Sequence, residues 1–227
     1  MSFLNLQHTP DQTLREEIIG TALRMNALGI NQGKSGNVSA RVSASNVAYL
    51  ITPTGVPYEE TRTEQIVAMH ADGTFDGDTL PSSEWRFHHD IYLARSDVNA
   101  IVHTHAPFAT TLACMDRAIP PFHYMVAVAG GKDIRCAPYA TFGSQVLSDF
   151  AVTALQDRNA CLLSHHGMIA CGIDLEKALA LAVEVESLAR MYWQALQMGE
   201  PGLLSDDEMQ IVLHKFKTYG QQGSSGK

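Results

Sequence analysis

The chain has 227 residues, of which 45% are hydrophobic and 18% charged, and its formal net charge is −8. This composition is ordinary for a globular protein, and the length favours one large domain. Scattered Lys and Arg residues in an acidic chain argue against a nucleic-acid-binding surface, and no run of about 20 apolar residues predicts a membrane span. The first residues lack a basic stretch followed by an apolar core, so we expect a cytoplasmic protein.

The first third of the chain predicts one helix and three strands. Residues 9–12 combine an N-cap, a proline at the first helical position and a capping-box partner, and apolar residues at helical spacing follow as far as Gly29. The strand-like runs 38–42 and 47–52 flank the polar residues 43–46, which is typical of a hairpin. Residues 66–70 predict a third strand before an Asp-Gly turn.

The rest of the chain alternates between helices and strands. Glu84 stands in the first turn of a helix that two serines introduce, and residues 100–105 predict a strand followed by a short helix from residue 106. Residues 160–164 are strand-like, and Asp174 caps a long helix that ends near residue 197. This alternation predicts a mixed α/β domain.

The ten histidines exceed what packing requires in an acidic chain, and several are clustered. Residues two apart on a strand point to the same face, so His103 and His105 form a pair of imidazoles. A third histidine, His165 or His166, follows a predicted strand next to Gly167, and the spacing alone does not choose between the two. Three histidines with an open fourth position are typical of catalytic zinc, and burial in the core is the alternative for any one of them.

The four cysteines, in contrast, show no C-x-x-C spacing and fall in apolar segments, so we interpret all of them as core residues: Cys114, Cys136, Cys161 and Cys171.

Two further segments suggest an anion site. Ser82 and Ser83 offer hydroxyls and free backbone N–H groups at a helix start beside Glu84, although simple helix capping explains the same tripeptide. A glycine-rich loop at residues 33–37 and the segment 52–55 present further donors, and each is equally interpreted as a plain turn. The first loop is no P-loop, because position 28 is leucine instead of the required glycine.

These pieces, in this order, resemble the class II aldolase family. The matching segments include GINQGKSGNVS at 29–39, ITPTGVPY at 51–58, LPSSEWRF at 80–87 and VHTH at 102–105. Further matches lie at 119–124, 137–143, 162–171 and 215–220, so the resemblance covers nearly the whole chain. It implies one domain over residues 1–220, with a central, mainly antiparallel β-sheet flanked by helices. The low-complexity composition of residues 221–227 predicts a flexible tail.

The resemblance also implies an activity and an assembly. The family branch that matches best cleaves L-fuculose 1-phosphate reversibly into dihydroxyacetone phosphate and L-lactaldehyde. One Zn²⁺ per subunit stabilises the negative charge that the cleavage leaves on the ketose fragment. The subunits form a fourfold-symmetric homotetramer with active sites at the subunit interfaces.

Particular residues match the family's site. The zinc ligands are matched by His103, His105 and His166, and Glu84 matches the acid/base, which can also be a fourth ligand when substrate is absent. The phosphate cradle is matched by Asn37, Thr54, Gly55, Ser82 and Ser83. The aldehyde end is matched by Tyr124, a proton donor that reaches across a subunit interface, and by Phe142 and Tyr219, which line it. One departure is Lys34, where the family leads us to expect a small neutral residue.

Related activities are the alternatives. A 4-epimerase of this family generally has Asp in place of Glu84 and lacks the match at Tyr124, which favours the aldolase. Decarboxylases and dehydratases that act on other sugar phosphates share the zinc and phosphate sites. A non-enzymatic, adducin-like interaction domain has no need for the three histidines and Glu84.

Overall fold

A computed structural model describes residues 10–42 and 47–217, and within them seven strands form one sheet. The order across the sheet is β3-β2-β1-β4-β7-β6-β5. All neighbouring strands are antiparallel except β5 and β6, which are parallel. The mainly antiparallel sheet that we expected is therefore confirmed. The strands are β1 (Asn37–Arg41), β2 (Val47–Ile51), β3 (Val67–His70), β4 (Ala100–Thr104), β5 (Arg135–Ala137), β6 (Ala160–Leu163) and β7 (Gly167–Gly172).

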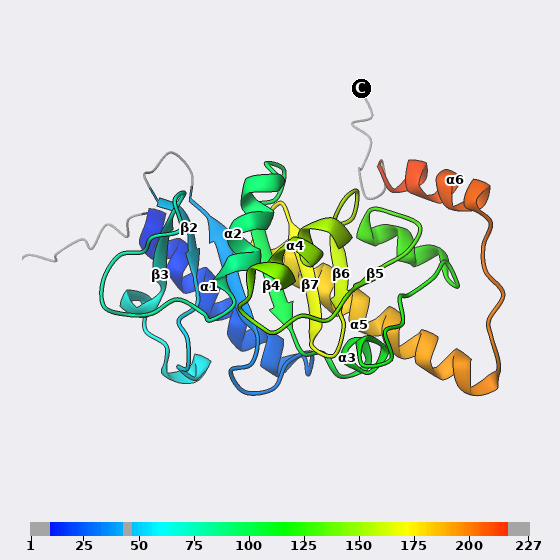
Figure 1. Ribbon diagram of the computed structural model, residues 1–227, viewed down its shortest axis with the longest axis horizontal. Helices are drawn as coiled ribbons and strands as arrows, with labels where there is room; N and C mark the ends of the chain where they lie inside the picture. The colour runs from blue at the N-terminus through cyan, green and yellow to red at the C-terminus, as the bar shows by residue number, and fades with distance from the viewer. Residues whose placement is uncertain (1–9, 43–46, 218–227) are drawn as a thin grey trace, which may run out of the picture.

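Helices cover both faces of this sheet (Figure 1). The α-helices are α1 (Pro10–Ala27), α2 (Trp85–Ala94), α3 (Pro107–Ala113), α4 (Gln145–Ala154), α5 (Leu175–Met198) and α6 (Asp206–Phe216). Short 3₁₀ helices are η1 (Tyr58–Glu60), η2 (Thr63–Gln65) and η3 (Tyr124–Ala129). Among the described residues, no helix has both the length and the apolar character needed to cross a membrane.

Two apolar cores lie on opposite faces of the sheet, because successive strand residues point to opposite sides. On one face, α1, α3 and α5 pack on residues such as Val38 and Val102. On the other face, α2 and α4 pack on residues such as Ile101 and Ile169. The α6 helix stands apart from the sheet and packs beside η3 (Figure 1).

The register of β1 and β4 places polar side chains under α2. Asn37 pairs with His103, and Ser39 pairs with Ile101. Because Val38 and Val102 face the other core, Asn37, Ser39 and His103 face α2. All three are at most 2% exposed, so each needs a polar partner inside the fold.

Several predicted details differ from the structure. Glu84 is the N-cap residue of α2 and precedes its first turn. The β4 strand ends at Thr104, so His105 follows it directly. Cys114 was predicted to be buried but is exposed, because it is the C-cap residue of α3. Cys136 is only partly buried. Cys161 and Cys171 are buried as expected. The predicted cap in residues 9–12 lies partly outside the described residues, and the hairpin turn 43–46 and the tail 221–227 lie wholly outside.

Candidate active site

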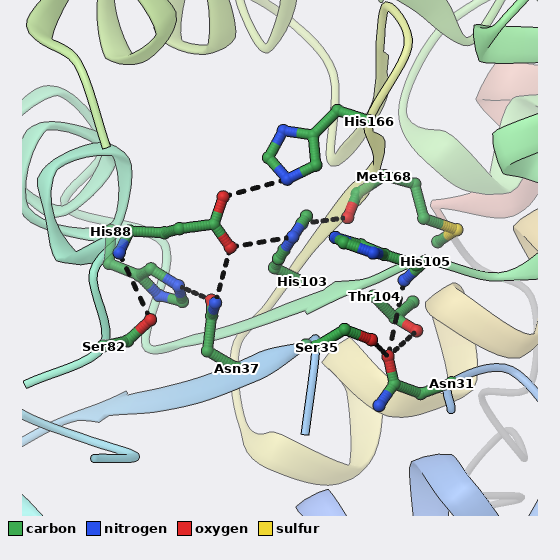
Figure 2. Close-up of polar contacts among 12 residues, drawn as sticks. Asn31, Ser35, Asn37, Ser82, His88, His103, Thr104, His105, His166 and Met168 are labelled. Atoms are coloured by element: carbon green, nitrogen blue, oxygen red, sulfur yellow. Dashed lines mark hydrogen bonds and ion pairs between the residues drawn. The ribbon is translucent and has the colours of Figure 1, made fainter. Parts of the chain in front are cut away.

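Three imidazoles meet at one end of β4. His103 belongs to β4, His105 follows that strand, and His166 lies in the turn between β6 and β7. Their ring centroids are 4.8 to 5.1 Å apart. Figure 2 shows the three rings close together. The antiparallel pairing of β4 with β7 thus joins two segments that are about 60 residues apart in the sequence.

The structure brings His166, and not His165, into this cluster. His165 has a φ of 52°, a left-handed conformation that is uncommon for a residue with a side chain. Its side chain is 53% exposed, and its Nε2 lies 3.9 Å from Asp116 Oδ2. The two adjacent histidines therefore point to different places.

Glu84 completes the cluster from the start of α2. Its Oε2 lies 3.1 Å from His103 Nε2, and its Oε1 lies 2.9 Å from His166 Nε2. Ligand atoms of Glu84 and the three histidines all lie within 4.8 Å of one another. The carboxylate is 5% exposed, so it is shielded from water by the same groups that it faces.

The donor pattern of the cluster fits a cation. His103 Nδ1 lies 2.9 Å from the Met168 carbonyl oxygen and donates to it, so Nε2, which faces Glu84, is the ring nitrogen left to bind a metal ion. His105 Nε2 is buried and has no hydrogen-bond partner among the described residues. A metal ion held by nitrogen lone pairs and a carboxylate oxygen satisfies all these atoms at once, and a backbone carbonyl on the far ring nitrogen is the usual support for such a ligand.

Protonation states in the cluster suit this arrangement. Burial lowers the pKa of His105 to about 4, and the neighbouring His103 and His166 act in the same direction. Burial alone raises the pKa of Glu84, but the adjacent imidazoles of His103 and His166 outweigh it and hold that pKa well below its ordinary value. At neutral pH His105 is therefore a neutral imidazole and Glu84 a carboxylate, which are the forms that bind metal ions.

A pocket of about 400 Å³ opens beside the cluster. Its lining residues come mostly from loops and are Lys34, Ser35, Gly55, Ser83, Glu84, His105, Tyr139, Ala140, Phe142, His165 and His166. Lys34 is the one Lys or Arg in this lining, and its Nζ donates to the Gly55 carbonyl at 2.7 Å. Of the predicted phosphate and aldehyde residues, Gly55, Ser83 and Phe142 line this pocket, together with the predicted metal-site residues Glu84, His105 and His166. Sequence analysis assigned no role to Ser35, Tyr139 or Ala140, although all three lie inside the matched segments 29–39 and 137–143.

The other predicted phosphate residues have different contacts. Asn37 Nδ2 donates to Glu84 Oε2 at 2.9 Å, so its amide points into the cluster. The Ser82 hydroxyl accepts from the Glu84 backbone N–H at 3.3 Å, and Ser82 lies in the bend that leads into α2. Thr54 is exposed, and its backbone N–H donates to the Leu80 carbonyl.

Tyr124 lies elsewhere in the same chain. It begins η3, is 51% exposed, and lines a separate pocket of about 560 Å³ together with residues of α6. The lining of the pocket beside the histidines does not include it. Tyr219, the other predicted aromatic residue, lies outside the described residues.

The fold and the Glu–His cluster define a metal-dependent aldolase of class II. Residues 16–193 match the family described as Class II Aldolase and Adducin N-terminal domain, and the chain belongs to this family of lyases. Two curated aldolases are similar over nearly their whole length. The 5-methylthioribulose-1-phosphate/5-deoxyribulose-1-phosphate aldolase of Rhodospirillum rubrum is 54% identical, with coverage of 91% of this chain and 92% of that protein. The L-fuculose phosphate aldolase of Escherichia coli K12 is 51% identical, with coverage of 91% and 95%.

A solved structure supports the same fold. An L-fuculose 1-phosphate aldolase superposes with a TM-score of 0.88 at 38% identity, covering 93% of this chain and 99% of the other.

Proposed function

We propose that this chain is a zinc-dependent aldolase that reversibly cleaves L-fuculose 1-phosphate to dihydroxyacetone phosphate and L-lactaldehyde. The observation that carries the proposal is the convergence of Glu84 with three imidazoles beside a pocket lined by Lys34. His103, His105 and His166 hold the zinc ion. Zinc supplies a Lewis acid for the negative charge that develops when the C3–C4 bond of the ketose breaks.

The residues of the chain move the protons. As C3–C4 breaks, the bonding electrons stay with C3, and Tyr124 of a neighbouring subunit accepts the proton of the C4 hydroxyl while the aldehyde leaves. Glu84, which takes up a proton from solvent once the substrate is bound, gives that proton to C3 to form dihydroxyacetone phosphate, and the proton on Tyr124 passes to solvent. In the direction of synthesis the two residues exchange roles. Phe142, together with Tyr219, lines the aldehyde end.

The phosphate lies at the end of the pocket that Gly55, Ser83 and Lys34 line, with Thr54 and Ser82 beside it. The start of α2, a ten-residue helix, favours an anion through the helix dipole. In a chain of net charge −8, the Lys34 ammonium supplies a local positive charge. Because the amide of Asn37 is engaged by Glu84, Asn37 contacts the phosphate only if that amide turns away.

The assembly is part of the proposal. A homotetramer with active sites at subunit interfaces explains why Tyr124, which the resemblance assigns to the aldehyde end, is exposed and lies outside the metal pocket of its own chain. If the active sites are shared in this way, we expect isolated subunits to be inactive.

The similarity to the Rhodospirillum rubrum protein supports a second candidate substrate. Cleavage of 5-deoxyribulose 1-phosphate between C3 and C4 gives the same dihydroxyacetone phosphate, with acetaldehyde in place of lactaldehyde. The zinc and phosphate ends are then unchanged, and only the aldehyde end near Phe142 distinguishes the two substrates.

The test is synthesis from dihydroxyacetone phosphate with L-lactaldehyde, acetaldehyde or (methylthio)acetaldehyde, followed by identification of each product and its stereochemistry. We expect the highest kcat/KM with L-lactaldehyde. Preference for one of the other two aldehydes assigns the second candidate. Zinc content is measured on the same preparation, and a protein that neither contains nor binds zinc contradicts the proposed chemistry.

A further inference from the structure

A line of buried hydrogen bonds runs from Glu84 along the contact between β1 and α2. Asn37 Nδ2 bonds to Glu84 Oε2 at 2.9 Å, and Asn37 Oδ1 lies 2.5 Å from His88 Nε2. His88 Nδ1 lies 2.7 Å from Ser39 Oγ, which lies 2.8 Å from the Tyr92 hydroxyl. Figure 2 shows the Asn37–His88 link. All five side chains are at most 5% exposed.

The hydrogen-bonded side chains come alternately from α2 with its start and from β1, and helix and strand geometry explain this order. Glu84, His88 and Tyr92 are spaced four residues apart, so they share one face of α2 and its start, with a rise of about 6 Å between them. Asn37 and Ser39 are two residues apart on β1, which gives a rise of about 6.6 Å. The spacing along the helix nearly equals the spacing along the strand. Asn37 therefore lies between Glu84 and His88, and Ser39 lies between His88 and Tyr92.

The line has one direction. The Asn37 NH₂ group must point to the Glu84 carboxylate, because the reversed amide places two oxygens against each other. Asn37 Oδ1 then accepts, so His88 carries its proton on Nε2. Burial lowers the pKa of His88 to about 3, so the ring is neutral and its Nδ1 accepts from the Ser39 hydroxyl. Ser39 in turn accepts from the Tyr92 hydroxyl, and every donor has one acceptor.

We propose that His88, Ser39 and Tyr92 are positioning residues for the aldolase reaction: they hold the amide of Asn37 in one orientation, and through it they hold Glu84 ready for proton transfer at C3. This inference rests on the proposed function of Glu84. None of the three touches the pocket beside the metal cluster. Side chains with no role beyond core packing have no need to be polar, since an apolar core needs no partners.

The first experiment measures the tautomer. Protein labelled with ¹⁵N-histidine and loaded with zinc is studied by long-range ¹H–¹⁵N NMR at neutral pH, and His88 is assigned by its absence from His88→Gln. We expect a protonated Nε2 and an unprotonated Nδ1. A proton on Nδ1 means that the line runs the other way, which overturns the proposal. This measurement needs no substrate, so it stands even if the protein cleaves no sugar phosphate.

The second experiment compares two buried serines. Ser39 and Ser148 are both 0% exposed, and Ser148 bonds to Asp90, away from the line. We expect Ser39→Ala to lower kcat by about 10- to 100-fold with little change in KM or zinc content, because the reacting groups lose their alignment while substrate and metal contacts stay. Ser148→Ala is the matched control and keeps its kcat. Equal losses in both variants, or a change confined to KM, overturn the proposal.

The third experiment tests His88 itself. His88→Leu removes both ring nitrogens, whereas the amide of His88→Gln restores a donor toward Asn37 Oδ1. We expect His88→Leu to lower kcat more than Ser39→Ala and His88→Gln to recover most of that loss. In a crystal structure of His88→Leu, we expect the Asn37 amide to turn away from Glu84. An unmoved Asn37, or equal activity in the two variants, overturns the proposal.

Discussion

The Glu84 carboxylate is ionised although it is buried, and burial by itself favours the neutral form of a carboxyl group. The imidazoles of His103 and His166, at 3.1 and 2.9 Å, hold its pKa well below the ordinary value in spite of burial. A positively charged metal ion bound by the same histidines also lowers the pKa of the Glu84 carboxyl group. The residue is therefore held as a carboxylate, the form that can accept a proton from C3 in the direction of synthesis.

Replacement of this carboxylate should separate chemistry from metal binding. We expect Glu84→Gln to lower kcat by about 10²- to 10⁴-fold, the usual contribution of a positioned acid/base, while zinc stays bound to the three histidines. Steady-state kinetics and zinc analysis of the same sample measure the two effects. Full activity in this variant would show that another group transfers the proton.

Lys34 should act on phosphate affinity. We expect Lys34→Gln to raise KM for the sugar phosphate by about 10-fold, the effect of one charge-assisted contact, and to leave kcat nearly unchanged. Lys177→Gln, an exposed lysine at the start of α5, is the control for the change in net charge. If both variants shift KM equally, Lys34 acts only through the overall field of the protein.

His88 should make the protein sensitive to acid. Its pKa is lowered to about 3 in the folded chain, against about 6.5 in an unfolded one, so between these values only the unfolded state binds the proton. Stability then falls as pH falls through this window, by up to about 1.4 kcal/mol per pH unit. The free energy of unfolding of the metal-free protein is measured by urea unfolding at several pH values from 4 to 7. We expect this free energy to change less steeply with pH in His88→Gln than in wild type. His214→Gln, an exposed histidine on α6, should keep the wild-type slope.

Part of this site could be predicted from residue types alone. The period of two on a strand gave the His103 and His105 pair, but His166 could be separated from His165 only by the resemblance or by the structure, because a left-handed φ at His165 is a property of the turn. The bond between Asn37 and Glu84 was also not predicted. This bond depends on the register between β1 and β4 and on where α2 lies, and neither follows from local sequence.

The turn between β6 and β7 is the element that delivers His166, and it depends on one glycine. A Cβ on Gly167 would lie 2.6 Å from the Thr104 carbonyl oxygen and 3.0 Å from His105 Cδ2. We expect Gly167→Ala to lower stability by about 1 to 3 kcal/mol and to weaken zinc binding, because β7 must move from β4. Thermal unfolding and zinc titration measure both effects.

Gly20 provides the control within α1. A Cβ there meets no atom within 4 Å, so Gly20→Ala should be neutral or stabilising by up to about 1 kcal/mol. A similar loss of stability in both variants would mean that the close contact at Gly167 is not the cause.

The strength of the local sequence signal decided only some of the elements. The long helix α5 has both an apolar stripe and the Asp174 cap, which accepts from the Lys177 backbone N–H. The three-residue strand β5 contains no β-branched residue and exists because it pairs with β6. The α6 helix was not predicted, although Ser205 and Glu208 form a recognisable start. Strand order depends on long-range pairing and came only with the structure.

At the scale of the whole molecule, two distant residues should complement each other. If each active site combines Glu84 of one subunit with Tyr124 of its neighbour, Glu84→Gln and Tyr124→Phe are each nearly inactive alone. Tetramers assembled from an equal mixture should regain about a quarter of wild-type activity, because half of the subunits carry each intact residue. The assay is performed after co-expression, with the mass of the assembly measured by light scattering. A monomeric protein, or no recovery in tetramers shown to contain both variants, contradicts a shared site.

The pocket has one buried wall and one exposed rim, and this division matters for redesign. Glu84 is 5% exposed and is held at the start of α2, whereas Tyr139 and Phe142 are 61% and 64% exposed and belong to a loop. Substitutions at the rim change shape without disturbing buried hydrogen bonds, so libraries confined to Tyr139, Ala140 and Phe142 should yield catalysts for new aldehyde acceptors that still use dihydroxyacetone phosphate as the donor.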